Sequence, residues 1–207
     1  LNYMAVKVVA DALSHPETCA WTNIFAPTVL LQTFGLSCIS MECMASYLSG
    51  FRIEDYFIDR AEADGIPPTL CSYHKEFLGA AGSGVLPRPA VGGTTSAACD
   101  GNISTFRWLH ERCGVKSFAV DVPYAWSPEA EEYVVTQLRK LIPALEGATG
   151  KKYDADALRE TLRRENRSKE YFRAALDRRL SHTYPNTLAL VLFLLLATHL
   201  YIGSEWV

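Results

Sequence analysis

Ser117-Phe118-Ala119-Val120-Asp121-Val122 is the clearest strand in this sequence, and the segments before it decide the fold. Residues 90–98 form a small-residue segment that suits a strand, and residues 103–113 have a helical pattern that ends at Gly114. A strand, a loop, a helix and a second strand in this order predict a right-handed crossover in a parallel sheet. Functional loops of such sheets follow the carboxyl ends of the strands, and Cys99 lies in such a loop.

The same alternation precedes this unit. Residues 19–25 and 36–40 are apolar runs of strand length, and residues 27–34 and 41–48 have helical patterns. We therefore predict an α/β fold with a Rossmann-like parallel sheet over residues 1–126.

Residues 127–207 are predicted to be a helical region. Ser127 and Pro128 are typical of a helix start, and Asp154 is a candidate cap for a second helix that continues to about Leu180. The sequence has no initiator Met and stops just after an apolar stretch, so we expect a fragment of a longer protein. In this interpretation the helical region leads to a second α/β domain outside the sequence.

Composition excludes several classes of protein. The chain has 207 residues, of which 49% are hydrophobic and 21% are charged, as in ordinary globular domains. A net charge of -3 gives no basic surface that would bind a polyanion, so we predict no nucleic-acid partner.

Six dispersed cysteines without a signal peptide favour reduced thiols and a cytoplasmic protein. Residues 187–203 are uncharged and near the length of a bilayer span, but without positive flanks a buried helix is the preferred interpretation, and we predict no membrane association.

Two cysteines lie in polar loops, Cys71 before Ser72-Tyr73-His74 and Cys99 before Asp100-Gly101-Asn102. A thiolate in a short loop suits a soft metal or an iron-sulfur cluster. The sequence has no Cys-x-x-Cys pair, however, and free cysteines more often serve packing. His74 is spaced to join a zinc site with Cys71, although a single Cys and His pair is usually incidental. The remaining cysteines occupy positions where a small apolar side chain is sufficient: Cys19, Cys38, Cys43 and Cys113.

Glu42 is the candidate acid or base, because it directly follows a predicted buried strand, where burial can raise a carboxyl pKa. The competing interpretation is a solvated Glu in the first turn of a helix, and sequence alone favours it. Residues 79–84, Gly-Ala-Ala-Gly-Ser-Gly, lack the Lys-Ser/Thr ending of a phosphate loop and are interpreted as a flexible turn.

The combination of motifs is more specific than any single one. Leu70-Cys71-Ser72-Tyr73-His74-Lys75 is followed in order by Thr94-Thr95-Ser96-Ala97-Ala98-Cys99-Asp100-Gly101-Asn102, by Phe106-Arg107-Trp108-Leu109, by Asp121-Val122-Pro123-Tyr124, and by a helix with Tyr133-Val134 and Gln137-Leu138. This series resembles the 2-hydroxyacyl-CoA dehydratase family, of the 2-hydroxyglutaryl-CoA dehydratase D-component type, which also includes benzoyl-CoA reductase subunits.

The resemblance implies a subunit that holds a [4Fe-4S] cluster close to the thioester of an acyl-CoA. Cys71 and Cys99 match the first two of three cluster ligands, and the third is expected beyond Val207. Glu42 matches a position where the family often has an acid close to the substrate. The implied activity is that of a lyase, the radical elimination of water from a 2-hydroxyacyl-CoA in an anaerobic cell. The implied partners are a paralogous dehydratase subunit, which gives a heterodimer, and an ATP-dependent activator that supplies one electron.

Alternatives stay open on sequence alone. Some active subunits of the family carry Ser three residues before the proline that matches Pro27 and Glu shortly after it, whereas this chain has Ile24, Thr28 and Val29. The chain can therefore be a benzoyl-CoA reductase-like subunit, or an electron-relay protein that performs no acyl-CoA chemistry. A further alternative, from a different class, is a membrane-tethered or purely structural α/β module.

Overall fold

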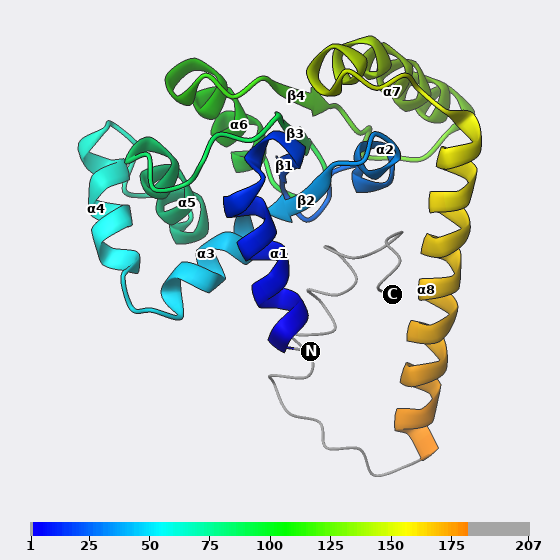
Figure 1. The fold of residues 1–207 in the computed structure, drawn as a ribbon, viewed down its shortest axis with the longest axis horizontal. Coiled ribbons are helices and arrows are strands. Elements are labelled where there is room, and N and C mark those ends of the chain that lie inside the picture. Colours follow the sequence, from blue (N-terminus) through cyan, green and yellow to red (C-terminus); the bar gives the residue numbers. More distant parts are fainter. Residues whose placement is uncertain (1, 182–207) are drawn as a thin grey trace.

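A four-stranded parallel sheet forms the centre of the protein (Figure 1). The computed structural model describes residues 2–181. Its strands are β1 (Cys19–Thr22), β2 (Ser37–Ser40), β3 (Val91–Thr95) and β4 (Ser117–Val120). Its helices are α1 (Asn2–Ser14), the 3-10 turn η1 (Pro16–Thr18), α2 (Thr28–Thr33), α3 (Met41–Ser49), α4 (Glu54–Ala63), α5 (Ser72–Gly82), α6 (Gly101–Cys113), α7 (Pro128–Thr149) and α8 (Ala155–Ser181). The predicted α/β class is confirmed, with strands somewhat shorter than their apolar runs.

The strand order is β2-β1-β3-β4, and every neighbouring pair is parallel. The chain therefore moves outward from β1 to β2 through α2, and outward in the opposite direction from β3 to β4 through α6. Right-handed crossovers in opposite directions require the two connecting helices to lie on opposite faces of the sheet. The strand order thus reverses between β1 and β3, which is where open α/β sheets bind their ligands.

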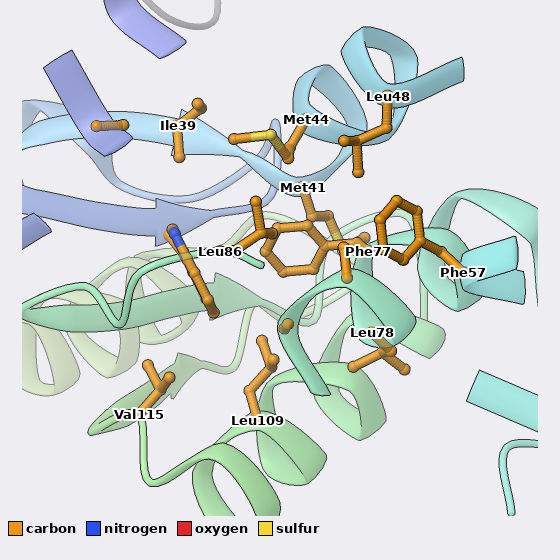
Figure 2. Packing of buried hydrophobic residues seen from close by; sticks show 14 of the residues in the cluster. Ile39, Met41, Met44, Leu48, Phe57, Phe77, Leu78, Leu86, Leu109 and Val115 are labelled. Atoms are coloured by element: carbon orange, nitrogen blue, oxygen red, sulfur yellow. The ribbon is translucent and has the colours of Figure 1, made fainter. Parts of the chain in front are cut away.

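Two apolar clusters cover the two faces of the sheet. The larger one packs α1, α3, α4, α5 and α6 against one face, and Figure 2 shows Met41, Phe57 and Phe77 from three of these helices meeting near its centre. The smaller one places Leu31 of α2 and Leu145 of α7 against the other face. Strands covered on both faces carry few charged side chains, and β1 and β2 are therefore visible in the sequence as short uncharged runs.

Residues 79–84 differ from their predicted structure. Gly79 and Gly82 lie inside α5, and the chain turns only after them, at Gly84, whose φ is +76°. The reason is close packing, because a Cβ atom at Gly79 would collide with the backbone carbonyl of Phe57 in α4. The glycines that suggested a turn therefore allow two helices to approach each other.

Helix α4 was not predicted, although it has recognisable signals. Glu54 and Asp55 lie in its first turn and Arg60 in its last, as the helix dipole favours. Its apolar contribution to the core is small, with Phe57 and Ala61 as its buried residues. Two buried residues give only a weak helical periodicity of apolar residues, which is why the sequence did not indicate this helix.

Two predictions concern the C-terminal third. The division at residues 126 and 127 stays a prediction, and α7 lies against the sheet through Leu145. Among residues 2–181, no helix is long and apolar enough to cross a membrane. The apolar stretch at residues 187–203 lies outside the described residues.

We expect Gly79→Ala to destabilise the protein by about 1–3 kcal/mol, because the added methyl group forces α4 and α5 apart. Gly147→Ala is the matched control, since Gly147 is also helical and a Cβ there meets no atom within 4 Å. The control substitution should stabilise the protein by about 0.5–1 kcal/mol through the better helix propensity of Ala. Urea unfolding of both variants measures the difference, and equal effects would contradict the close α4–α5 contact.

Candidate functional site

The loops after β1 and β3 lie side by side at the carboxyl edge of the sheet. β1 pairs with β3 through Thr22 and Gly93, so the segments that follow them leave the sheet together. The Thr95 hydroxyl donates a hydrogen bond of 3.3 Å to the carbonyl of Phe25 and joins the two loops. The strand order also reverses at this edge, and open α/β sheets bind their ligands at such a point.

Cys71 lies at the start of α5, as its N-cap residue. Its carbonyl accepts the first helical hydrogen bond, from the Lys75 N–H at 3.1 Å, and its side chain is exposed. Pro67 and Pro68 keep the preceding segment out of the helix. The positive end of a helix dipole favours an anion at such a position.

Cys99 lies in the short loop between β3 and α6, and its side chain is half-exposed. The preceding Ala98 has φ +63°, and a hydrogen bond of 2.9 Å from the Cys99 N–H to the Ala97 carbonyl closes a three-residue turn around it. A left-handed conformation is unfavourable for Ala, so this turn is held by its surroundings. The Cys99 carbonyl then accepts from the Asn102 N–H at 3.2 Å as α6 begins.

His74 connects the two cysteine segments. It lies three residues after Cys71 on α5, and its Nε2 is 3.7 Å from the Cys99 Sγ. On the other side of the ring, Nδ1 is 2.6 Å from the Thr105 Oγ1 of α6. Burial lowers the pKa of His74, which favours the neutral imidazole. The structure thus brings the N-terminal end of α5, with Cys71, beside the loop that carries Cys99.

The other cysteines have a different environment. Cys19 and Cys43 are buried in or beside the apolar clusters, and burial raises the pKa of Cys19 to about 12 and that of Cys43 to about 11. Burial also raises the pKa of Cys38 and that of Cys113 at the end of α6. A thiol that resists ionisation is a poor metal ligand. Cys71 and Cys99 are therefore the cysteines whose exposure and position suit ligation.

Glu42 lies directly after β2, in the first turn of α3, and points toward the loop after β1. Its Oε1 accepts a hydrogen bond of 3.4 Å from the Ile24 N–H, while its buried Oε2 has no partner among the described residues. Burial raises the pKa of Glu42, and the hydrogen bonds it accepts only partly oppose this effect. The solvated first-turn interpretation therefore does not fit, and a role in acid or base chemistry stays a prediction.

Two asparagines at this edge were missed by the sequence analysis. Asn23 follows β1 and Asn102 lies in the first turn of α6, and both are almost completely buried. Neither side-chain amide has a hydrogen-bond partner for its nitrogen or its oxygen among residues 2–181. An unpaired buried amide destabilises a protein by about 1–3 kcal/mol, so such groups usually mark a site that serves a ligand or ordered water. The sequence prediction placed Asn23 inside the strand over residues 19–25, whereas β1 ends at Thr22, so Asn23 directly follows the observed strand.

The described residues do not by themselves form a complete metal site. Within the described part of the chain, no group of three His, Cys, Asp or Glu side chains is arranged to hold a metal ion. Two accessible thiols at one edge of the sheet fit two ligands of a cluster, and a further ligand would have to come from elsewhere. The unpaired amides of Asn23 and Asn102 are consistent with a site that is completed by another group.

The sequence matches a known protein family. The family model described as 2-hydroxyglutaryl-CoA dehydratase, D-component, matches residues 23–207, which is most of the chain. No curated protein matches the sequence.

The environments of the cysteines predict the order in which a thiol reagent reaches them. In the metal-free native protein, iodoacetamide should modify the exposed Cys71 first and the half-exposed Cys99 and Cys113 more slowly. The buried Cys19, Cys38 and Cys43 should react only when the protein unfolds. Mass spectrometry of peptides over time measures this order, and early modification of Cys38 would contradict the packing described.

Glu42→Gln keeps the oxygen that faces the Ile24 N–H and removes the ionisable group. Because the pKa of Glu42 is raised above its ordinary value of 4.5, the folded protein favours the neutral carboxyl group. The resulting stabilisation is present below the ordinary pKa and is lost as the pH rises through the folded-state pKa. The free energy of unfolding of the variant should therefore increase relative to that of the wild type as the pH rises from the ordinary pKa of 4.5 through the folded-state pKa.

Glu129→Gln is the matched control, since Glu129 also lies in the first turn of a helix. Hydrogen bonds from its own backbone N–H and from Ser127 lower its pKa, so the folded protein favours the ionised form. This variant should lose stability relative to the wild type as the pH rises, which is the opposite direction. Urea titrations at several pH values measure both slopes, and equal slopes would show that Glu42 is solvated.

Proposed function

Because the chain belongs to the 2-hydroxyglutaryl-CoA dehydratase D-component family, we propose that it is an iron-sulfur subunit of a 2-hydroxyacyl-CoA dehydratase. The family assignment supports a component of a dehydratase system, that is, of a lyase. The structural observation in favour of the cluster is the position of two accessible thiols, Cys71 and Cys99, at the ligand-binding edge of the sheet. The proposed reaction removes water from a 2-hydroxyacyl-CoA.

Cys71 and Cys99 would hold a [4Fe-4S] cluster together with a third cysteine outside the described residues. When bound, a cluster with three thiolate ligands supplies a single electron and an open iron that acts as a Lewis acid. The helix N-termini at α5 and α6 favour the negative charge of the two thiolates. The third ligand would come from a later part of the protein, so the described residues are expected to supply two of the three.

The reaction needs a proton acceptor and a proton donor close to the acyl group. The proton at C3 of a 2-hydroxyacyl-CoA is not acidic, and it becomes acidic once the thioester has gained an electron and the 2-hydroxyl group has left. Glu42 is a partly buried carboxyl group at this edge, with one oxygen fixed by the Ile24 N–H and one unpaired. Its raised pKa suits a group that protonates the departing hydroxyl and then, when ionised, accepts a proton.

The proposal includes two protein partners. A paralogous subunit would complete a heterodimer, and an ATP-dependent activator would deliver the electron. Exposed, reduced thiols are best preserved in the cytoplasm of an anaerobic cell, which we propose as the compartment.

The decisive experiment is to purify the full-length protein without oxygen and to count iron and sulfide per chain. We expect the Cys71→Ala, Cys99→Ala double variant to lose the cluster, because both thiolates are proposed ligands. Cys113→Ala is the control and should keep it, since Cys113 lies at the opposite end of α6. Iron content that is unchanged in the double variant would refute the proposal.

An electron-relay role without acyl-CoA chemistry is the second candidate. It is favoured by Ile24, an apolar residue whose N–H contacts Glu42. Some active subunits of the family carry Ser at this position. Calorimetry with an acyl-CoA separates the two candidates, because a relay protein should show no binding. Micromolar binding would favour the dehydratase, and it should weaken in the Glu42→Gln variant if the acyl group lies beside this carboxyl.

A further inference from the structure

His74 is a buried side chain at the candidate site for which the proposed reaction has no use. Its ring lies between two helices, with Nε2 facing the Cys99 sulfur at 3.7 Å and Nδ1 facing the Thr105 hydroxyl at 2.6 Å. Both ring nitrogens therefore have a partner, and the ring links α5 to the loop before α6. Buried ring nitrogens need hydrogen-bond partners, and here one of the two partners is the sulfur of a candidate metal ligand.

We infer that His74 is a positioning residue that donates a hydrogen bond from Nε2 to the Cys99 sulfur and fixes it for metal binding. This inference rests on the proposed function, because the sulfur is taken to be a cluster ligand. A metal-bound thiolate can only accept a hydrogen bond, so Nε2 must carry the proton of the neutral ring. Nδ1 is then the acceptor, and the Thr105 hydroxyl is the donor that fixes this tautomer.

The backbone next to the contact is shaped to permit it. Gly101 is the first residue of α6, and a Cβ atom there would lie 3.3 Å from the His74 Cε1 and 3.5 Å from the Cys99 Sγ. Any longer side chain at this position would press against both partners. Thr105 is itself almost completely buried, four residues further along the same face of α6. The donor His74 is therefore held by the first turn of α5, the orienting Thr105 by α6, and the acceptor Cys99 by the loop that leads into α6.

Hydrogen bonds to ligand sulfurs have measurable consequences. They withdraw electron density from the sulfur and raise the reduction potential of an iron-sulfur cluster. Groups that orient a metal ligand also strengthen metal retention, and their loss typically weakens it by about 10–100-fold. A purely structural histidine would change protein stability without shifting the potential.

The first test reads the contact in the metal-free full-length protein. With histidine labelled with nitrogen-15, nuclear magnetic resonance should show His74 as a single neutral tautomer. Cys99→Ala should shift the Nε2 signal, and Thr105→Val should shift Nδ1 and mix the tautomers. A Nε2 signal that does not respond to Cys99→Ala would overturn the inference, whether or not the protein binds iron.

The second test uses the protein reconstituted with iron and sulfide. His74→Phe removes both nitrogens at similar ring size, and we expect a more negative midpoint potential and iron loss to a chelator about tenfold faster. His74→Gln retains an N–H donor and should restore part of both properties. The control is His110→Phe, because His110 contacts the Val115 carbonyl at the other end of α6 and should leave the potential unchanged.

The outcomes separate the two proposals. A wild-type protein without iron would refute the proposed function, while the nuclear magnetic resonance result would still decide the contact. A wild-type cluster whose potential is the same in His74→Phe would support the proposed function and overturn the role of His74.

Discussion

The pairing of β1 with β3 is the constraint from which the rest of the site follows. Trp21 of β1 lies opposite Gly92 of β3, and the two strands run in the same direction. A Cβ at Gly92 would press on Phe106, and one at Gly93 would collide with the ring of Phe118. The two glycines therefore let α6 and β4 pack closely around β3. This close packing brings the start of α6, and with it the Cys99 loop, to the edge where β1 also ends.

Local sequence signals identified most of this architecture. The Gly114 stop of α6 and the Ser127 cap of α7 occur as predicted, because they depend on backbone conformation and hydrogen bonds within a few residues. The contact between His74 and Cys99 was not predictable in the same way, since it joins a helix to a loop 25 residues further along the chain. The role of Gly79 was misinterpreted for a related reason, because a glycine at a helix contact and a glycine in a turn are identical in sequence.

Glu42 is a residue whose environment the sequence left open, and its role stays a prediction. Its position after a strand indicated a functional edge, whereas its place in a first helical turn equally indicated a solvated acid. Tertiary structure decides between them, because the loop after β1 covers the carboxyl group and supplies the Ile24 N–H. Asn23 and Asn102 extend this pattern, since their unpaired amides destabilise the fold at the same edge. Residues that lower the stability of the fold in this way are typical of functional sites.

The left-handed turn at Ala98 has a consequence for ligand capture. A strained turn that is already formed in the free protein has few alternative conformations, so Cys99 loses little freedom when a ligand arrives. The turn loses its conformational freedom during folding, so little further entropy is lost when a ligand binds. In the proposed cluster site, the scaffold thereby presets the position of Cys99 before a ligand binds.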